Sequence, residues 1–206
     1  CAGEYSFTIN TYGPTGMETD SPVTITGISG EASEMERVTL TIDMLSDNAN
    51  HVGDGGGLPA LIDGKVNTYY HTKWNAPVTT EAHYVQIKLN KPLKDLCFEY
   101  DARQSGVNNG GDVKAATIYG SMNGEFFESM GNEEFNLPTT NGGHATAKNN
   151  VSGKQAYNYI RFTPTARRDK DPLDYTVAGS AWWNMSEIYL YRIRPVSYTH
   201  LTLPTN

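Results

Sequence analysis

The sequence lacks any run of 18 consecutive apolar residues, so we expect no helix that crosses a membrane. No signal-peptide pattern is present. Basic residues are also scarce, since 16 Lys and Arg against 23 Asp and Glu give a net charge of −7. This balance argues against nucleic acid as a partner, because phosphate binding needs clustered basic side chains. The one close basic pair, Arg167 and Arg168, is followed by Asp169 and Asp171 and is predicted to lie in a solvated loop.

Cysteine is scarce too, and two cysteines are too few to imply a disulfide framework. Cys97 lies in the strand-like run LCFEY at residues 96–100 and is predicted to be a buried free thiol. A disulfide between Cys1 and Cys97 is the alternative. Two interpretations of Cys1 also stay open. It is either the lipid-bearing first residue of a mature lipoprotein or simply the boundary of a fragment.

Helical periodicity is the third absence, because apolar residues almost nowhere recur at i, i+3, i+4 and i+7 for more than two turns. Short alternating runs separated by Asn- and Gly-rich turns occur instead, a pattern typical of a β-sandwich or jelly roll. Residues 121–127, SMNGEFF, are predicted to form a hairpin with an Asn-Gly tip. The strand-like runs lie at residues 5–9, 23–25, 38–42, 84–89, 96–100, 115–119, 157–163 and 188–191.

The most informative segment spans residues 61–89, LIDGKVNTYYHTKWNAPVTTEAHYVQIKL. Asp63 and Gly64 place a carboxylate in a tight turn, and Thr68 adds a second oxygen five residues after the Asp. A dense group of residues that stack on sugars or hydrogen-bond to them follows: Tyr69, Tyr70, His71 and Trp74. Residues 83–89 then alternate like a half-buried strand.

In order and spacing, this segment resembles the discoidin domain, also called the coagulation factor 5/8 C-terminal domain, and is most similar to family 32 carbohydrate-binding modules. Residues 159–162, YIRF, resemble the family's penultimate core strand, and residues 186–191, SEIYLY, its closing strand. The resemblance covers about residues 37–193. It implies an all-β, discoidin-like jelly-roll β-sandwich of the galactose-binding-domain-like type.

This resemblance divides the chain into three parts. Residues 35–195 form the discoidin domain. Residues 1–34 are the end of a preceding β domain or extra strands on the sandwich edge, because so short a segment cannot bury a core alone. Residues 196–206, VSYTHLTLPTN, look like a translated sequencing adaptor, with a natural edge strand as the alternative.

The resemblance also implies a structural calcium ion, which prefers six to eight oxygen ligands. In the family, one Asp, nearby carbonyls, a Thr and a Glu of the last strand hold it. On this sequence the ligands become Asp63, Thr68 and Glu187 with the carbonyls of Ala60, Lys65 and Ser186. From the residues alone, the alternative is that Asp63 caps its turn and that Glu187 pairs with a nearby cation.

For a galactose-like sugar, the family uses a His, an aromatic residue three positions later, and an Arg with an Asn five positions after it. Here His71 precedes Trp74 by three and Arg103 precedes Asn108 by five. Trp74 would stack on the sugar, while the polar residues would hold its hydroxyls. Asp54 and Trp182 are further candidates. The alternatives are packing roles for Trp74 and His71, an ion pair of Arg103 with Asp101 or Asp112, and a core-capping role for Trp182 and Trp183. His51, His83, His144 and His200 are assigned no ligand role.

The favoured function is therefore a non-catalytic module that binds glycans on a secreted or cell-surface protein, with an outer-membrane lipoprotein as one option. Other domains of the parent chain are the expected partners. The alternative is an adhesion module for protein or phospholipid. Catalysis is disfavoured, because the strongest carboxylate pair, Asp63 and Glu187, is assigned to calcium and no HExxH, GxSxG or phosphate-loop motif occurs.

Overall fold

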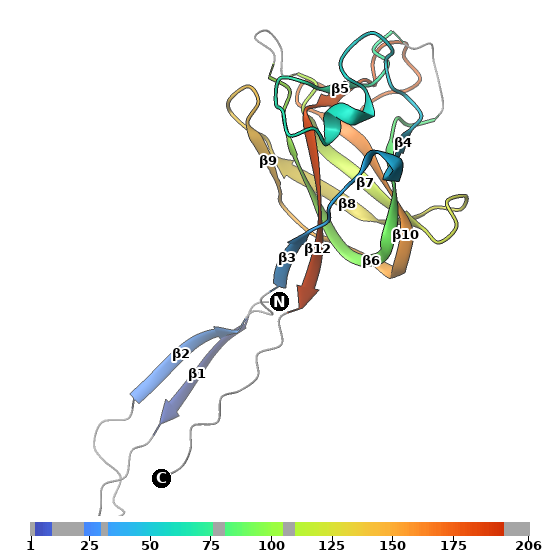
Figure 1. Cartoon of the computed structure of the whole chain (residues 1–206). Coiled ribbons are helices and arrows are strands. Elements are labelled where there is room, and N and C mark those ends of the chain that lie inside the picture. The colour runs from blue at the N-terminus through green and yellow to red at the C-terminus, as the bar shows by residue number, and fades with distance from the viewer. Residues whose placement is uncertain (1–2, 10–22, 30–32, 76–80, 105–109, 196–206) are drawn as a thin grey trace, which may run out of the picture. The chain divides into compact units, whose positions relative to one another are not determined.

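The computed structural model describes residues 3–9, 23–29, 33–75, 81–104 and 110–195, which are built mainly of strands (Figure 1). The chain divides into two units, and Met35–Ile193 is the larger. The other unit contains β1 (Gly3–Ile9) and β2 (Val23–Ser29), which pair antiparallel from Gly3 opposite Ser29 to Ile9 opposite Val23. The assignment of this hairpin to the end of a preceding domain stays a prediction. The proposed adaptor tail, residues 196–206, lies outside the described residues.

Eight strands form one antiparallel sheet in the order β10-β7-β8-β9-β6-β12-β3, with β4 beside β6. Because β6 pairs with β10 as well as with β9, the sheet curls back on itself around a core. The predicted all-β jelly-roll sandwich is confirmed. The strands are β3 (Ser33–Arg37), β4 (Leu45–Asp47), β6 (Val85–Asp101), β7 (Val113–Ser121), β8 (Glu128–Asn136), β9 (His144–Ala147), β10 (Val151–Arg167) and β12 (Glu187–Pro195).

Alternation in β6 and β10 decides which side chains enter the core. Ile160 and Phe162 of β10 pair with Ile87 and Val85 of β6, and all four are fully buried. Burial of such side chains stabilises each by about 1.5–3 kcal/mol. The core also contains aromatic pairs, such as Phe98 with Phe162 and Tyr100 with Phe135, whose ring centroids lie 5.0 and 5.3 Å apart.

The strand predictions were wrong at one run and missed β3, β8 and β9. The run at residues 38–42 is not a strand: β3 ends at Arg37, and a 3₁₀ turn, η1 (Ile42–Met44), follows. Val38 and Leu40 are partly buried against the core, but Ile42 is 48% exposed, so the alternation there marked an irregular segment and not a strand. In contrast, β8 was missed because its sequence, ESMGNEEFN, is mostly polar, although Met130, Glu133 and Phe135 are buried.

The prediction of a hairpin at residues 121–127 is confirmed between β7 and β8. Its loop is longer than a two-residue turn and is held by side chains. The Ser121 hydroxyl accepts from the Gly124 N–H at 2.9 Å, and Asn123 Oδ1 accepts from the Glu125 N–H at 3.0 Å. Gly124 has φ +82°, a left-handed conformation that glycine adopts without strain.

Cys97 is a buried free thiol as predicted. Cys1, its alternative disulfide partner, lies outside the described residues. Burial raises the pKa of the Cys97 thiol to about 12, so the reactive thiolate is not formed near neutral pH. The helices in the described residues are two 3₁₀ turns, and neither is long or apolar enough to cross a bilayer.

At one end of the sandwich, a second 3₁₀ turn, η2 (Leu58–Leu61), lies beside the short strand β5 (Tyr70–His71) (Figure 1). β5 pairs antiparallel with β11 (Asn184–Met185), with His71 opposite Asn184. This two-residue pairing joins the segment after η2 to the segment before β12. It therefore brings residues more than 100 positions apart in the sequence to the same end of the fold.

Candidate functional site

Seven polar and aromatic side chains gather at this end of the sandwich, on four separate segments. We name this set the loop cluster. It comprises His51, Asp54, Tyr69, His71, Trp74, Arg103 and Trp182. His51 and Asp54 lie between β4 and η2, Arg103 follows the end of β6, and Trp182 precedes β11.

Asp54 is the centre of the loop cluster. Its Oδ1 accepts a hydrogen bond from the Tyr69 hydroxyl at 2.7 Å, and its Oδ2 accepts one from the Trp74 indole N–H at 2.9 Å. Burial alone would raise the pKa of Asp54, but these hydrogen bonds and the nearby charges hold it below its usual value of 3.8. The carboxylate is therefore ionised at neutral pH and fixes the orientation of both rings.

The glycines around Asp54 explain how its loop reaches the rings. Gly53 and Gly55 have φ +91° and +88°, conformations that other residues rarely adopt. A Cβ atom at Gly55 would also collide with the backbone and the ring of Tyr69. The loop therefore needs glycine at this position to lie close enough for the carboxylate to meet Tyr69.

Arg103 rests on the ring of Tyr69, with its guanidinium carbon 3.6 Å from the ring centroid. The alternative ion pairs do not form, because Asp112 binds Arg168 at 2.9 Å and Asp101 binds His144 at 2.7 Å. The buried Nε of Arg103 has no hydrogen-bond partner in the protein. Stacking therefore orients this guanidinium while leaving donor capacity unused.

His71 is buried, and its Nδ1 lies 2.6 Å from the Thr72 carbonyl oxygen. Because a carbonyl only accepts, Nδ1 carries the proton and Nε2 of the neutral ring is an acceptor. Burial lowers the pKa of His71, so this neutral form is the one present at pH 7. The ring stacks on Trp182 with 5.2 Å between centroids, so it is held on two sides.

Trp74 remains 46% exposed, the property that ligand stacking requires. One face of its ring is covered by His51, which lies parallel to it within 3° at a centroid distance of 5.2 Å. His51 was assigned no ligand role, yet it is a direct neighbour of the predicted stacking ring. Nothing in its local sequence separates it from a histidine in an ordinary loop.

Trp182 and Trp183 divide between two environments. Trp183 is fully buried against Tyr70, 5.3 Å away, and belongs to the core. Trp182 contacts His71 and also carries the Arg167 guanidinium, whose carbon lies 3.8 Å from its ring centroid. The ring of Trp182 thus already has two partners within the protein.

The predicted solvated loop at Arg167 and Arg168 is wrong. Arg167 is 7% exposed and donates to the Trp182 carbonyl at 2.8 Å as well as to Asp169 at 2.6 Å. Arg168 binds Asp112, which is completely buried. The burial of a carboxylate this deep requires a charged partner, so Arg168 serves the fold rather than solvent contact.

The structure thus brings together five of the six predicted sugar-binding residues: Asp54, His71, Trp74, Arg103 and Trp182. Asn108, the sixth, lies outside the described residues. Tyr69 was grouped in the sequence with residues that stack on or hydrogen-bond to sugars but was not among the six predicted ligands, although it joins Asp54 to Arg103. The adjacent pair Tyr69 and Tyr70 could have indicated a role for Tyr69. Neighbouring side chains of an extended segment face opposite sides, so when Tyr70 is buried Tyr69 faces away from the core.

A second polar group, here called the acidic loop, consists of Asp63, Gly64, Lys65 and Thr68 with Glu187 of β12. Thr68 Oγ1 lies 2.9 and 2.8 Å from the two carboxylate oxygens of Asp63. Glu187 Oε1 accepts from the N–H groups of Gly64 and Lys65 at 2.7 and 3.0 Å. The loop is therefore tied to the last strand through Glu187, and the alternative partner, a nearby cation, is replaced by backbone N–H groups.

The two carboxylates of the acidic loop face each other. Burial and the neighbouring Asp63 carboxylate raise the pKa of Glu187 to about 7. The described residues contain no group of three or more His, Cys, Asp or Glu side chains placed to hold a metal, so carbonyls would have to complete any site here. Two carboxylates, a hydroxyl and backbone carbonyls are the oxygen donors that Ca²⁺ prefers. The donor set therefore fits the implied ion.

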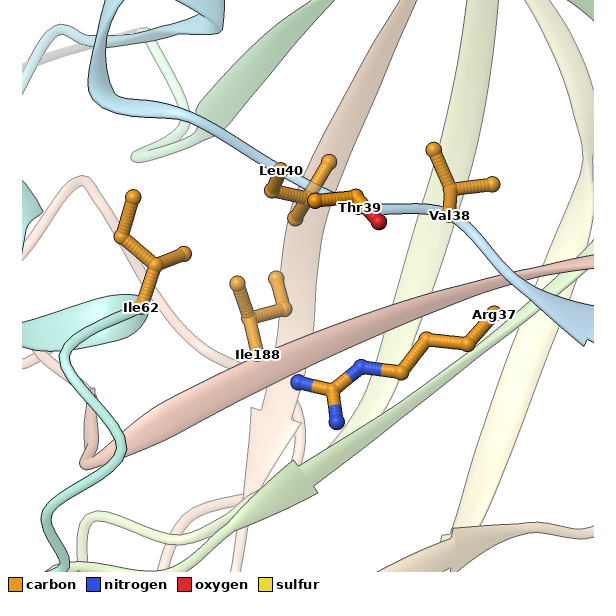
Figure 2. Close-up of a pocket in the computed structure, with 6 residues that line it drawn as sticks. All are labelled: Arg37, Val38, Thr39, Leu40, Ile62 and Ile188. Carbon is orange, nitrogen blue, oxygen red and sulfur yellow. The ribbon is translucent and has the colours of Figure 1, made fainter.

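A hollow of about 350 Å³ lies outside the loop cluster. Figure 2 shows Val38, Thr39 and Leu40 of the segment after β3 above Ile62 and Ile188, with Arg37 at its side. Its lining is mainly aliphatic, with no ring for sugar stacking and one charged group. No residue of the loop cluster lines it.

The sequence matches the F5/8 type C domain model over residues 46–187. Among solved structures, the F5/8 type C domain of a Bacteroides fragilis protein is 16% identical with a TM-score of 0.51, covering 77% of this chain and 96% of that one. A fragment of a putative chitobiase from Bacteroides thetaiotaomicron is 14% identical with a TM-score of 0.50, covering 80% and 96%. The CBM32-5 module from Clostridium perfringens, solved with GalNAc-β-1,3-galactose, is 20% identical with a TM-score of 0.45, covering 71% and 92%.

No curated protein matches the chain at a significant level. The two Bacteroides structures agree with the closed antiparallel sheet described above, and at these identities they bear on the fold alone. The family model spans most of the larger unit, from β4 to the first residue of β12. The chain belongs to the F5/8 type C, or discoidin, domain family.

Proposed function

We propose that the domain is a non-catalytic carbohydrate-binding module that recognises terminal galactose-like sugars through the loop cluster. The observation that carries the proposal is the convergence of Trp74, Arg103 and His71 around the ionised Asp54. An exposed ring, an oriented guanidinium and a fixed hydrogen-bond acceptor are the three elements that a pyranose requires. They come from two separate segments, with Asp54 on a third, and meet only in the folded chain.

Each residue has a distinct part in this proposal. The free face of Trp74 stacks on the apolar face of the sugar, and Arg103 donates two hydrogen bonds to neighbouring hydroxyls. His71 Nε2 accepts from a third hydroxyl. Asn108 remains a proposed ligand from the sequence spacing alone. We expect millimolar affinity, about 4–5 kcal/mol, because an open site buries little surface.

Asp54 and Trp182 act as supports for ligand contacts rather than as contacts themselves. Both oxygens of Asp54 are used by Tyr69 and Trp74, so the carboxylate positions the rings. Trp182 holds His71 and is itself covered by Arg167. We therefore revise the suggested role of Trp182 from a second sugar-stacking wall to a support for the His71 ring.

We also propose that the acidic loop holds one calcium ion with a structural role. Asp63, Thr68, Glu187 and the carbonyls of Ala60, Lys65 and Ser186 are the candidate ligands. The ion would neutralise the facing carboxylates and tie the segment before β5 to β12. Because Ser186 also bonds the Val66 carbonyl at 2.9 Å, stiffening this loop would steady the backbone that leads to Tyr69.

The acids available in the loop cluster support the proposal that the domain is non-catalytic. Hydrolysis of a glycosidic bond uses two carboxyl groups about 5–10 Å apart across the sugar. The loop cluster as described contains one, Asp54, and both of its oxygens are engaged. We propose that the domain is an accessory module of an extracellular or cell-surface protein. By binding glycans, it would keep the rest of that protein close to its glycan targets.

The test is a calorimetric titration of residues 35–195 with methyl β-galactoside. Trp74→Ala and Arg103→Lys should each abolish measurable binding, because one removes the stacking face and the other replaces a planar fork by a point charge. Phe126→Ala is the matched control, since this ring is 80% exposed on the β7–β8 loop, outside the loop cluster. Melting curves verify the fold of each variant.

Equal affinity in the parent and both cluster variants would overturn the assignment of the site. If the folded parent bound anionic vesicles and no galactoside, the adhesion function would replace the carbohydrate function. Vesicle binding is therefore measured in parallel by co-sedimentation, with the Trp74→Ala variant as the comparison.

A further inference from the structure

Arg161 lies on the outward face of β10, and the side chains that hold its guanidinium do not belong to the loop cluster. Its neighbours in the strand, Ile160 and Phe162, are fully buried, so the alternation of the strand turns Arg161 outward. Two rings hold the guanidinium: its carbon lies 4.1 Å from the ring centroid of Tyr84 and 3.6 Å from that of Phe127. The side chain of Arg161 is thus held in place by residues that lie outside β10.

One edge of the guanidinium is also fixed, because Nε donates to Gln86 Oε1 at 2.8 Å. Gln86 lies directly opposite Arg161 on β6. The two terminal NH₂ groups form no hydrogen bond with a described residue and are not buried. Their N–H donors are therefore available to a ligand, and they lie in the plane of a guanidinium that Gln86 and the two rings already orient.

No carboxylate among the described residues forms an ion pair with Arg161, whereas Arg167 and Arg168 each bind an aspartate. The chain carries a net charge of −7, so acids are abundant, yet none in the part of the chain that the structure describes pairs with this cation. A fork-shaped donor that is held in place and lacks its counter-charge is complementary to a carboxylate, which it binds with two parallel hydrogen bonds.

Aromatic residues extend the surface on both sides of Arg161. Tyr119 lies directly opposite it on β7, and Tyr159 lies two residues earlier on the same face of β10. Directly opposed side chains on one face are about 5 Å apart. Both tyrosines are partly exposed. The face therefore offers ring surfaces beside the guanidinium, which suits a ligand with flat apolar faces as well as a carboxylate.

We propose that this face of the sheet is a second binding site, and that its ligand is a carboxylate-bearing sugar of the uronic-acid class. The ligand carboxylate binds the free edge of Arg161, and the sugar ring lies against Tyr119 or Tyr159. Gln86 and the rings of Tyr84 and Phe127 position the arginine. The site shares no residue with the loop cluster, and its occupation does not depend on neutral-sugar binding there.

The experiment uses NMR titration of the Trp74→Ala variant, in which the loop cluster has lost its stacking ring. Methyl galacturonide is the probe, and methyl galactoside is its neutral counterpart. We expect the galacturonide to bind and to shift the amide signals of Gln86, Tyr119 and Tyr159, whereas the galactoside does not. Adding Arg161→Gln should weaken galacturonide binding at least about tenfold, the usual effect of removing a charge-assisted pair.

Matched variants separate a ligand role from a structural one. Arg37→Gln removes another ring-stacked arginine, which lies 4.3 Å from the Tyr189 ring centroid, and should leave galacturonide binding unchanged. Arg161→Lys keeps the charge without the fork and should lose most of the affinity. If Arg161→Gln fails to fold, the Arg161→Lys variant and the shift map of the parent still decide the question.

Three results would overturn the proposal. The first is the absence of galacturonide binding to a folded Trp74→Ala variant. The second is binding that persists when Arg161 is replaced. The third is that acetate, at the same concentration, displaces the galacturonide as well as free galacturonide does. This would mean that the arginine binds small anions in general and does not recognise the sugar ring. If the parent protein does not bind the galactoside, in contrast, only the function proposed for the loop cluster is overturned.

Discussion

The loop cluster and the core directly beneath it use the same kinds of ring in opposite ways. Trp182 and Trp183 are adjacent in sequence, yet Trp183 is fully buried against Tyr70 whereas Trp182 supports His71 in the loop cluster. Core rings are held by packing. Cluster rings are held by one carboxylate, a guanidinium and stacking on other rings. Stability and ligand recognition should therefore respond to different substitutions, even at neighbouring positions.

The largest expected effect lies on the core side of this comparison. Trp183→Ala should lower the free energy of unfolding by about 3–5 kcal/mol, because a large buried ring is replaced by a cavity. Trp182→Ala should cost clearly less, since its ring is only partly buried. Urea unfolding of both variants measures the difference. Equal losses would mean that Trp182 belongs to the core after all.

The acidic loop should behave like the core rather than like the loop cluster. We expect a chelator to lower the melting temperature of the parent, because an ion that binds only the folded state at 100 times its Kd stabilises it by about 2.7 kcal/mol. Asp63→Ala should remove this sensitivity without changing which sugar is preferred. Asp43→Ala, an exposed acid on η1, is the control. Unchanged melting in excess chelator, with no metal in elemental analysis, would remove the calcium proposal.

A smaller effect tests whether the carboxylate really orders the cluster rings. Asp54→Asn keeps the size but replaces one acceptor oxygen by a donor, so the Trp74 indole or the Tyr69 hydroxyl loses its partner. Galactoside affinity should fall about tenfold while stability changes little. Asp43→Asn supplies the matched loss of charge. An Asp54→Asn variant that bound like the parent would show that packing, as in the core, is enough to orient Trp74.

The smallest effect concerns pH. Because burial lowers the pKa of His71 below 6.5, the ring stays neutral in the folded protein at pH 7 and Nε2 accepts. Affinity is therefore fully present above pH 6.5. It is lost as the pH falls through the lowered pKa, because protonated Nε2 no longer accepts a hydrogen bond from the sugar. A series of titrations from about pH 7.5 downward measures this loss. His71→Gln keeps an acceptor and should make the affinity independent of pH in this range.

How far the sequence could predict the structure differs between the same two regions. Alternation and turn residues predicted most strands, because burial of one face imposes a period of two on the sequence. It failed at β8, where polar residues fill the pattern, and at residues 38–42, where Val38 and Leu40 are partly buried but belong to no strand. Spacing brought Asp54, His71, Trp74 and Arg103 together as candidates only through resemblance to a family.

The contacts within the loop cluster could not be predicted from spacing. No local pattern indicates that His51 stacks on Trp74, that Tyr69 carries Arg103, or that Arg167 is buried on Trp182. These contacts join residues on different loops, so they depend on how the sandwich brings the loop ends together. The pairing of β5 with β11 sets that arrangement, and each strand has two residues, too few to leave a periodic signal.

The most direct test of the central claim uses the three tryptophans of the chain, because their indole N–H groups give separate NMR signals. Trp74 and Trp182 report on the loop cluster, and Trp183 reports on the core. On titration with methyl β-galactoside, the Trp74 signal should shift most and the Trp182 signal less, while the Trp183 signal stays in place. A Trp74 signal that does not move while the sugar binds, or a Trp183 signal that shifts as far as Trp74, would contradict the assignment of the loop cluster as the ligand site.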